Sequence, residues 1–157
     1  MREILFRGKR TDNGEWVNGG SIIQFIEDGV RSFYMPQYNE ICTSTHDAFT
    51  DDILGFEDCR FYKVGGETIC QYTGMEDING VSIYEGDIVV SLYNGKSYPV
   101  RFGEYTYIDD WGDEQSACGW YTESDEEGNE AIGCPNEWAT VIGNIYDNPE
   151  LLKGEEK

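Results

Sequence analysis

Residues 71–90, QYTGMEDINGVSIYEGDIVV, decide the fold that we predict for this chain. The stretch opens with β-forming residues that we expect to end at Gly74. Asn79-Gly80 is typical of a tight turn, because both residues tolerate positive φ. The β-formers that follow are interrupted by Glu85-Gly86-Asp87 and resume at Ile88. The pattern predicts a strand, a loop, a short strand, a turn and a core strand, as at the start of small SH3-like barrels.

The rest of the chain repeats this alternation of short β runs and turn signals. Asp12-Asn13-Gly14, Asp28-Gly29 and Asn94-Gly95 each separate two β-rich runs, and Asn94-Gly95 predicts a type I′ hairpin turn. The 19 glycines favour many short strands over a few long helices. We therefore predict a mainly β fold of antiparallel meanders and SH3-like small barrel units. One or two short helices are expected, over residues 46–54 and from Pro149 onward with Asn148 as N-cap.

The length of 157 residues allows one ordinary domain or two very small ones. Gly65-Gly66 suggests a soft boundary between an N-terminal β unit, 1–66, and a C-terminal SH3-like barrel unit, 67–152. The two units can equally pack as a single domain, and residues 153–157 are expected to fray. Residues 104–130 carry ten acids and no Lys or Arg, and we expect a long hairpin excursion there with its tip at 125–129.

The net charge of −20, from 31 acidic and 11 basic residues, limits the partners of the chain. Such a surface repels nucleic acid phosphates and anionic membranes, so we expect neither as a direct partner. The five cysteines are an odd number, and the first seven residues lack the apolar segment of a secretory signal. No apolar run is long enough to span a membrane. We therefore expect a cytoplasmic protein with reduced thiols.

Two acidic groups have both a functional and a structural interpretation. Glu85 and Asp87 are candidates for a cation site or an acid/base pair, but an Asp in a turn more often accepts backbone N–H bonds. The cluster Asp109, Asp110, Asp113 and Glu114 suits calcium in ligand type, but it lacks the EF-hand spacing and is better explained as a solvated charge run.

The cysteine and histidine residues show no catalytic or zinc-binding pattern. No C-x-x-C occurs, and His46 is the single histidine, four residues after Cys42. Neither a G-x-S-x-G nor a phosphate-binding glycine loop is present. The sequence thus predicts no catalytic residue, no metal ligand and no cofactor site.

The aromatic residues of the excursion are the remaining candidates for function. Trp and Tyr are enriched at protein interfaces, whereas binding to bases would require a positive groove. The alternative is that these rings pack the outer face of a long hairpin. The candidate partner-binding surface consists of Tyr105, Tyr107, Asp109, Asp110, Trp111, Trp120 and Tyr121.

Three stretches together resemble the YopX family of small phage and prophage proteins. The first is residues 1–7 followed by Gly14-Glu15-Trp16-Val17, and the second is residues 71–89. The third is residues 141–152, VIGNIYDNPELL. The resemblance implies a mostly β fold, a phage or prophage source and a location in the host cytoplasm. It supplies no activity and no catalytic residues, and we recognise no family pattern in residues 36–60 and 104–135.

These observations leave three functional hypotheses. The leading one is a non-enzymatic protein-interaction module in the bacterial cytoplasm, whose partner is a host or phage protein or a second copy of the chain. The second is an acidic mimic of DNA that occupies a host DNA-binding protein, since no Lys or Arg occurs from Phe102 to Leu152. The third is a metal-dependent enzyme that uses Glu85, Asp87 or the acids of 109–114.

The charge of the chain predicts that salt stabilises it. Because mobile ions screen the mutual repulsion of the acidic side chains, the melting temperature should rise as NaCl goes from about 10 mM to about 150 mM. Circular dichroism measures this directly. A melting temperature that falls over the same range would contradict the prediction.

Overall fold

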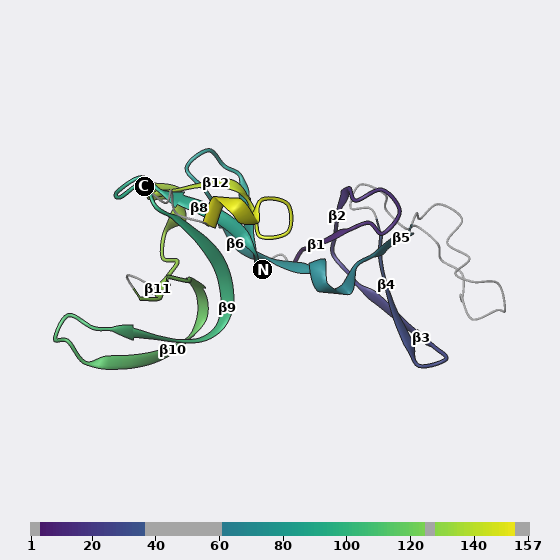
Figure 1. Ribbon diagram of the computed structural model, residues 1–157, viewed down its shortest axis with the longest axis horizontal. Helices are drawn as coiled ribbons and strands as arrows, with labels where there is room; N and C mark the ends of the chain where they lie inside the picture. Colours follow the sequence, from purple (N-terminus) through teal and green to yellow (C-terminus); the bar gives the residue numbers. More distant parts are fainter. Residues whose placement is uncertain (1–3, 37–60, 125–127, 153–157) are drawn as a thin grey trace. The chain divides into compact units, whose positions relative to one another are not determined.

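The computed structural model describes residues 4–36, 61–124 and 128–152 and is mainly β (Figure 1). Its strands pair with antiparallel neighbours, and its helical turns are three short 3-10 helices. The predicted fold class is confirmed. The chain forms two compact units, which meet between Gln71 and Tyr72 in the sequence. The division into domains 1–66 and 67–152 stays a prediction.

The N-terminal unit is a set of short antiparallel strands around a small core. Its elements are β1 (Phe6–Lys9), β2 (Trp16–Gly19), β3 (Ile23–Glu27), β4 (Val30–Pro36), β5 (Phe61–Val64) and η1 (Gly66–Thr68). β1 pairs with β2 and with the first residues of β6, while β3, β4 and β5 form a meander. Val17, Met35 and Val64 are its buried core.

The C-terminal unit holds the longer strands. Its elements are the rest of β6 (Cys70–Glu76), β7 (Ser82–Tyr84), β8 (Asp87–Ser91), β9 (Ser97–Ile108), β10 (Glu114–Thr122), β11 (Glu130–Ala131), η2 (Pro135–Glu137), β12 (Ala139–Asn144) and η3 (Pro149–Leu152). The sheet order is β11-β10-β9-β8-β12, and Figure 1 shows β9 and β10 curling away from β8 and β12. The core comprises Ile83, Val89, Val100, Ile132 and Ala139.

Strand β6 continues through Gly74, so the predicted break at this residue is wrong. Pairing shifts from Tyr72↔Tyr84 to Glu76↔Ser82, which marks a bulge in β6. The Thr73 hydroxyl donates to the Ile83 carbonyl (2.8 Å) and accepts the Met75 N–H (3.1 Å). The glycine, at φ 83°, therefore allows a bulge and does not end the strand.

Asp77 closes the loop between β6 and β7 and ties that loop to β12. One carboxylate oxygen accepts the N–H groups of Asn79 (2.8 Å) and Val81 (2.9 Å), and the other accepts the N–H of Val141 (3.0 Å). The residue is only 2% exposed. Burial raises the pKa of Asp77, but the backbone hydrogen bonds from Val141, Val81 and Asn79 together outweigh burial, so the pKa lies below its ordinary value.

The turn dipeptides fold differently from one another. Asp28-Gly29 is the two-residue turn, with φ of 48° and 79°. At Asn94-Gly95 the glycine alone has positive φ, and the Ser91 N–H donates to the Lys96 carbonyl across a four-residue loop. The hairpin predicted there is confirmed, but the type I′ turn is wrong, because Ser91 Oγ also accepts the Tyr93 N–H and stabilises the longer loop.

Gly86 joins the central and closing segments of the C-terminal unit. Its N–H donates to the Val100 carbonyl (2.8 Å), and its carbonyl accepts the Ile145 N–H (2.9 Å). A Cβ at this position would lie 3.3 Å from the Tyr146 ring and 3.4 Å from Ile145, at a φ of 76° that disfavours other residues. The backbone approach therefore requires glycine.

The excursion over 104–130 is a long hairpin, but its tip differs from the predicted one. β9 and β10 reverse at residues 109–113, with Ile108 opposite Glu114. The predicted tip, residues 125–129, falls between β10 and β11, and 125–127 lie outside the described residues. The chain reverses there because the Asp109 side chain accepts hydrogen bonds within the loop. The sequence shows Asp109 only as one acid in an acidic run, so it did not reveal this turn.

The two predicted helices have different outcomes. Residues 149–152 form η3, where the Leu151 N–H donates to the Asn148 carbonyl (3.1 Å), so a short helix there is confirmed as a 3-10 turn. The helix predicted over residues 46–54 lies outside the described residues.

We predict that Asp77→Ala destabilises the chain by about 3 kcal/mol, because three backbone N–H groups lose a charged acceptor that is itself buried. Urea unfolding followed by tryptophan fluorescence measures the change. Asp109→Ala is the matched control, since Asp109 accepts the same pattern of loop N–H bonds at an exposed position. Equal losses of stability in the two variants would contradict the role assigned to Asp77.

Candidate functional site

The β9–β10 hairpin presents one face rich in tyrosine, which we call the tyrosine face. The register places Tyr105 opposite Ala117, Tyr107 opposite Gln115 and Tyr121 opposite Arg101. Because side chains alternate along a strand, these residues share one side of the sheet. Ala131 of β11 pairs with Tyr121 and extends this face.

A pair of glycines lets two tyrosines stack across the hairpin. Gly103 lies directly opposite Gly119, between the levels of Tyr105 and Tyr121. Neither glycine has a side chain to separate the rings, which stack at 4.7 Å between centroids and 22° between planes. Tyr107 packs beside Tyr105, with 6.0 Å between centroids. The rings therefore form one continuous aromatic layer.

Asp109 fixes the tip of the hairpin. Its Oδ1 accepts the N–H groups of Trp111 (3.0 Å) and Asp113 (2.9 Å), and its Oδ2 accepts the Gln115 amide (3.0 Å). The Asp109 N–H donates to the Asp113 carbonyl, and the Gly112 N–H donates back to the Asp109 carbonyl. These bonds, led by the one from the Asp113 N–H, hold the pKa of Asp109 below its ordinary value.

Trp111 is the most exposed aromatic side chain of the hairpin. It is 86% exposed, although its backbone is held by Asp109. Burial normally stabilises a large aromatic ring, and the Trp111 indole lacks that burial because its loop is held in a conformation that exposes it to solvent. The loop therefore carries an anchor suited to a partner surface.

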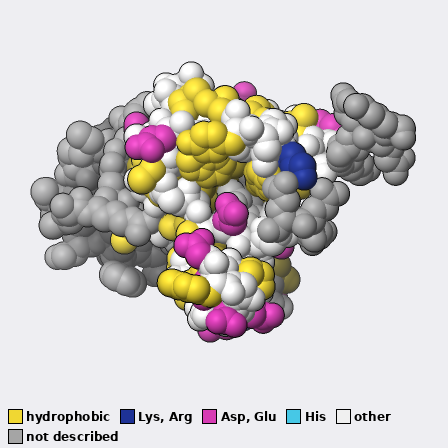
Figure 2. Space-filling model, turned by 90° about the vertical axis from the view of Figure 1, so that its left-hand side faces the viewer, with side chains coloured by type: hydrophobic (Ala, Val, Ile, Leu, Met, Phe, Trp, Pro, Cys, Tyr) yellow, Lys and Arg dark blue, Asp and Glu magenta, His cyan; other side chains and the backbone are white. Residues whose placement is uncertain are grey.

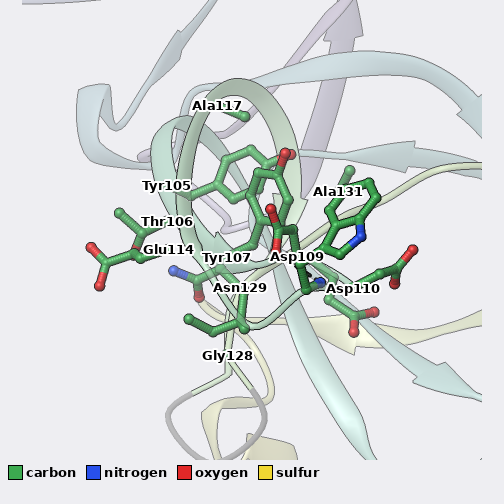
Figure 3. A pocket seen from close by; sticks show the side chains of 13 residues that line it. Tyr105, Thr106, Tyr107, Asp109, Asp110, Glu114, Ala117, Gly128, Asn129 and Ala131 are labelled. Atoms are coloured by element: carbon green, nitrogen blue, oxygen red, sulfur yellow. Dashed lines mark hydrogen bonds between the residues drawn. The ribbon is translucent and has the colours of Figure 1, made fainter.

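The tip and the tyrosine face enclose an open cavity of about 610 Å³. Figure 3 shows Tyr105 and Tyr107 pointing into it, with Asp109 and Asp110 at one side and Ala131 across from the rings. Gly128 and Asn129, from the segment before β11, close another side. The cavity combines aromatic walls with a carboxylate rim.

The structure brings five of the seven predicted surface residues to this cavity: Tyr105, Tyr107, Asp109, Asp110 and Trp111. Tyr121 does not line it but stacks on Tyr105. Trp120 lies on the opposite face of the hairpin, where it packs against the core and against Phe102, 4.8 Å between ring centroids. Trp120 therefore has a packing role in this structure.

The electrostatic character of this unit is strongly acidic. Figure 2 shows acidic and hydrophobic side chains mixed on one face of the molecule, with little Lys or Arg in view. From residue 72 to 152 the sequence has two basic residues, Lys96 and Arg101. Arg101 forms an ion pair with Glu123 (3.0 Å), so its charge is locally compensated. A complementary partner would carry positive charge.

The acids of the tip do not assemble a metal site in the described part of the chain. No group of three or more His, Cys, Asp or Glu side chains is placed there to hold an ion. Asp109 already accepts three hydrogen bonds. Among the cysteines, Cys70 is buried, Cys118 and Cys134 are exposed, and Cys42, Cys59 and His46 lie outside the described residues.

Glu85 and Asp87 do not act as a pair in this structure. Asp87 is buried and accepts the Tyr84 N–H (2.8 Å), which confirms its predicted role in the turn. Glu85 is half-buried, and burial raises its pKa while the charge of Arg101 acts in the opposite direction. The two carboxylates thus have separate environments.

Sequence reasoning missed a second apolar surface, in the N-terminal unit. The β3–β4 hairpin exposes Ile26 (64%) and Val30 (65%), and with Phe25 and Tyr34 they line an open cavity of about 620 Å³. The sequence does contain a sign of this surface. Phe25 and Ile26 are both apolar and successive residues of one strand, so their side chains point to opposite faces and one of the two faces away from the core.

Comparison with known families identifies the group to which this fold belongs. The family model described as YopX protein matches residues 5–153, so the chain belongs to the YopX family. The resemblance inferred from the sequence is confirmed. Comparison with curated proteins finds no match.

The chain is also similar to solved structures. One of them is the crystal structure of protein EF1440 from Enterococcus faecalis, with 20% sequence identity and a TM-score of 0.44. The alignment covers 95% of this chain and 97% of the other. Within the residues that the structure describes, no helix is long and apolar enough to cross a membrane.

We predict that Glu85→Gln raises the urea midpoint at pH 7. The raised pKa means that the ionised carboxylate is disfavoured in the folded state, so removal of its charge stabilises folding above that pKa. The gain should shrink as pH falls through the raised pKa, because wild-type Glu85 then becomes neutral. Glu104→Gln removes one exposed charge and is the matched control; an equal gain from it would contradict the prediction.

Proposed function

We propose that this YopX-family protein is a non-enzymatic protein-interaction module of phage or prophage origin that acts in the bacterial cytoplasm. Its interaction surface is the tip and tyrosine face of the β9–β10 hairpin, and its partner is a host or phage protein with a basic surface. The single observation that carries this proposal is Trp111, 86% exposed on a loop fixed by Asp109.

The composition of the surface supports a protein partner. An exposed indole, adjacent tyrosines and carboxylates at the rim match the aromatic centre and polar rim of protein interfaces. The tip is already ordered by its own hydrogen bonds, which lowers the entropy lost on association. The residues used are in place before any partner binds.

The acidic mimic of DNA remains a narrower form of the same proposal. It is favoured by the absence of Lys and Arg from residues 102 to 152, where the acids would stand in for phosphates. In that case the partner is a DNA-binding protein, and DNA competes with this chain for it. The metal-dependent enzyme has less support, because in the described part of the chain no three His, Cys, Asp or Glu side chains are grouped to hold an ion.

Capture of a partner from bacterial lysate tests the surface. We expect the tagged chain to retain a stoichiometric protein, and Trp111→Ala to weaken that complex by about 30-fold, the size of an interface hot spot. Tyr93→Ala is the matched control, because Tyr93 is 80% exposed on the β8–β9 loop of the same unit. Isothermal titration calorimetry with the purified partner measures both effects.

Two outcomes would oppose the proposal. One is a chain that stays monomeric and captures nothing under several salt conditions. The other is an equal loss of affinity in Tyr93→Ala and Trp111→Ala, which would mean that the tip has no special role. Addition of duplex DNA separates the two forms of the proposal, since it displaces only a DNA-binding partner.

A further inference from the structure

The outer edge of β10 is open along most of its length. β10 pairs with β9 over all nine residues, from Glu114 to Thr122. On its other side, the described residues pair with it only at the end: Ala131 lies opposite Tyr121, Glu130 lies opposite Thr122, and the Ile132 N–H donates to the Trp120 carbonyl. Residues 114–119 therefore form a free strand edge in the described part of the chain.

The alternation of an antiparallel ladder shows which backbone groups are available. The Trp120 carbonyl accepts from Ile132, so the polar groups of Trp120 point away from β9. Every second residue of a strand has the same orientation. The N–H and C=O groups of Glu114, Ser116 and Cys118 thus also point outward, and all three residues are exposed.

Beyond Glu114 at its start, this edge lacks the features that usually prevent strand addition. Natural edge strands are protected by Lys, Pro, a bulge or a covering element. Residues 115–119 read QSACG, with no charge and no Pro, and their pairing to β9 has no register shift. The small side chains leave the backbone accessible to another strand.

The residues beside the edge favour a partner segment that carries positive charge. The tyrosine face and the tip border it with Tyr107, Trp111, Asp110 and Glu114, and no Lys or Arg occurs from residue 102 to 152. Aromatic faces and carboxylates both attract Lys and Arg side chains. A second copy of this chain would bring the same acids to the edge, so like charges oppose self-pairing.

We infer that β10 accepts an extended, Lys- or Arg-bearing segment of the partner protein as an additional antiparallel or parallel strand. The partner backbone pairs with Glu114, Ser116 and Cys118, and its basic side chains lie against the tyrosine face and the tip. The inference rests on the proposed function and specifies how the partner binds.

Ser116→Pro tests the edge without breaking the hairpin. Proline removes the outward N–H, which no residue of β9 uses, and edge strands tolerate proline for this reason. Ser116→Thr, which keeps the N–H, is the control. Circular dichroism and melting temperature establish that both variants of the full chain remain folded.

The probe is a synthetic peptide of about eight residues, ordinary strand length, with alternating Lys and Val. A second peptide has the same sequence but is N-methylated at two adjacent central residues, so both of its edges lose a donor while its charge is unchanged. A third replaces Lys by Glu. Binding is measured by calorimetry at about 0.15 M salt, where long-range charge attraction is screened.

We expect the Lys-Val peptide to bind saturably. Ser116→Pro and N-methylation should each weaken binding at least about ten-fold, a loss of about 1.4 kcal/mol. Ser116→Thr should stay close to wild type, and the Glu peptide should not bind.

Four results would overturn the inference: no saturable binding of the Lys-Val peptide, equal binding of the N-methylated peptide, equal binding by Ser116→Pro, or a dimer that Ser116→Pro abolishes. The proposed function fails separately. If a captured partner depends on Trp111 but not on Ser116, the interaction surface stands and strand addition does not.

Discussion

The carboxylate of Asp77 is the interaction on which the C-terminal unit depends. It accepts three backbone N–H groups, two within its own loop and one from Val141, 64 residues further along the chain. The Ile78 N–H adds a bond to the Ala139 carbonyl beside it. A buried charge is stable only when it is so satisfied, and here the charge positions β12 against the β6–β7 loop. β12 in turn pairs with β8, which leads through β9 to the hairpin.

The chain uses the same turn twice, with different results. Asp77 and Asp109 each begin an Asp-x-x-Gly-x loop and accept the N–H groups two and four residues later. The second oxygen of Asp77 reaches another strand, whereas that of Asp109 accepts only from the neighbouring Gln115. One turn therefore holds the core together, and the other holds an exposed tip that carries Trp111. Local stiffness without burial is what a preformed interaction surface requires.

The three stretches whose sequence resembles the YopX family maintain the fold, and the proposed surface lies between the second and the third of them. The Gly86 carbonyl accepts the Ile145 N–H, and the Asp87 carboxylate closes the turn after β7 by accepting the Tyr84 N–H. The side-chain oxygen of Asn144 accepts the N–H groups of Tyr146 and Asp147. The β9–β10 hairpin projects from this frame with an acidic rim, an aromatic face and an open edge. This arrangement separates the residues that stabilise the unit from those proposed to bind a partner.

The sequence by itself determined the β class, the family, most hairpins and the role of Asp87, because turn chemistry and strand propensity act over a few residues. It did not determine that β6 bulges at Gly74, that the long hairpin turns at 109–113, or that Asn94-Gly95 closes a four-residue loop. Those depend on a hydrogen bond that the Thr73 hydroxyl donates and on hydrogen bonds that the Asp109 and Ser91 side chains accept. Only the tertiary structure decided that Trp120 packs inward while Trp111 faces solvent, and that Asp77 reaches Val141. The physical reason is that strand register and long-range acceptors are set by pairing between distant segments, which no local pattern records.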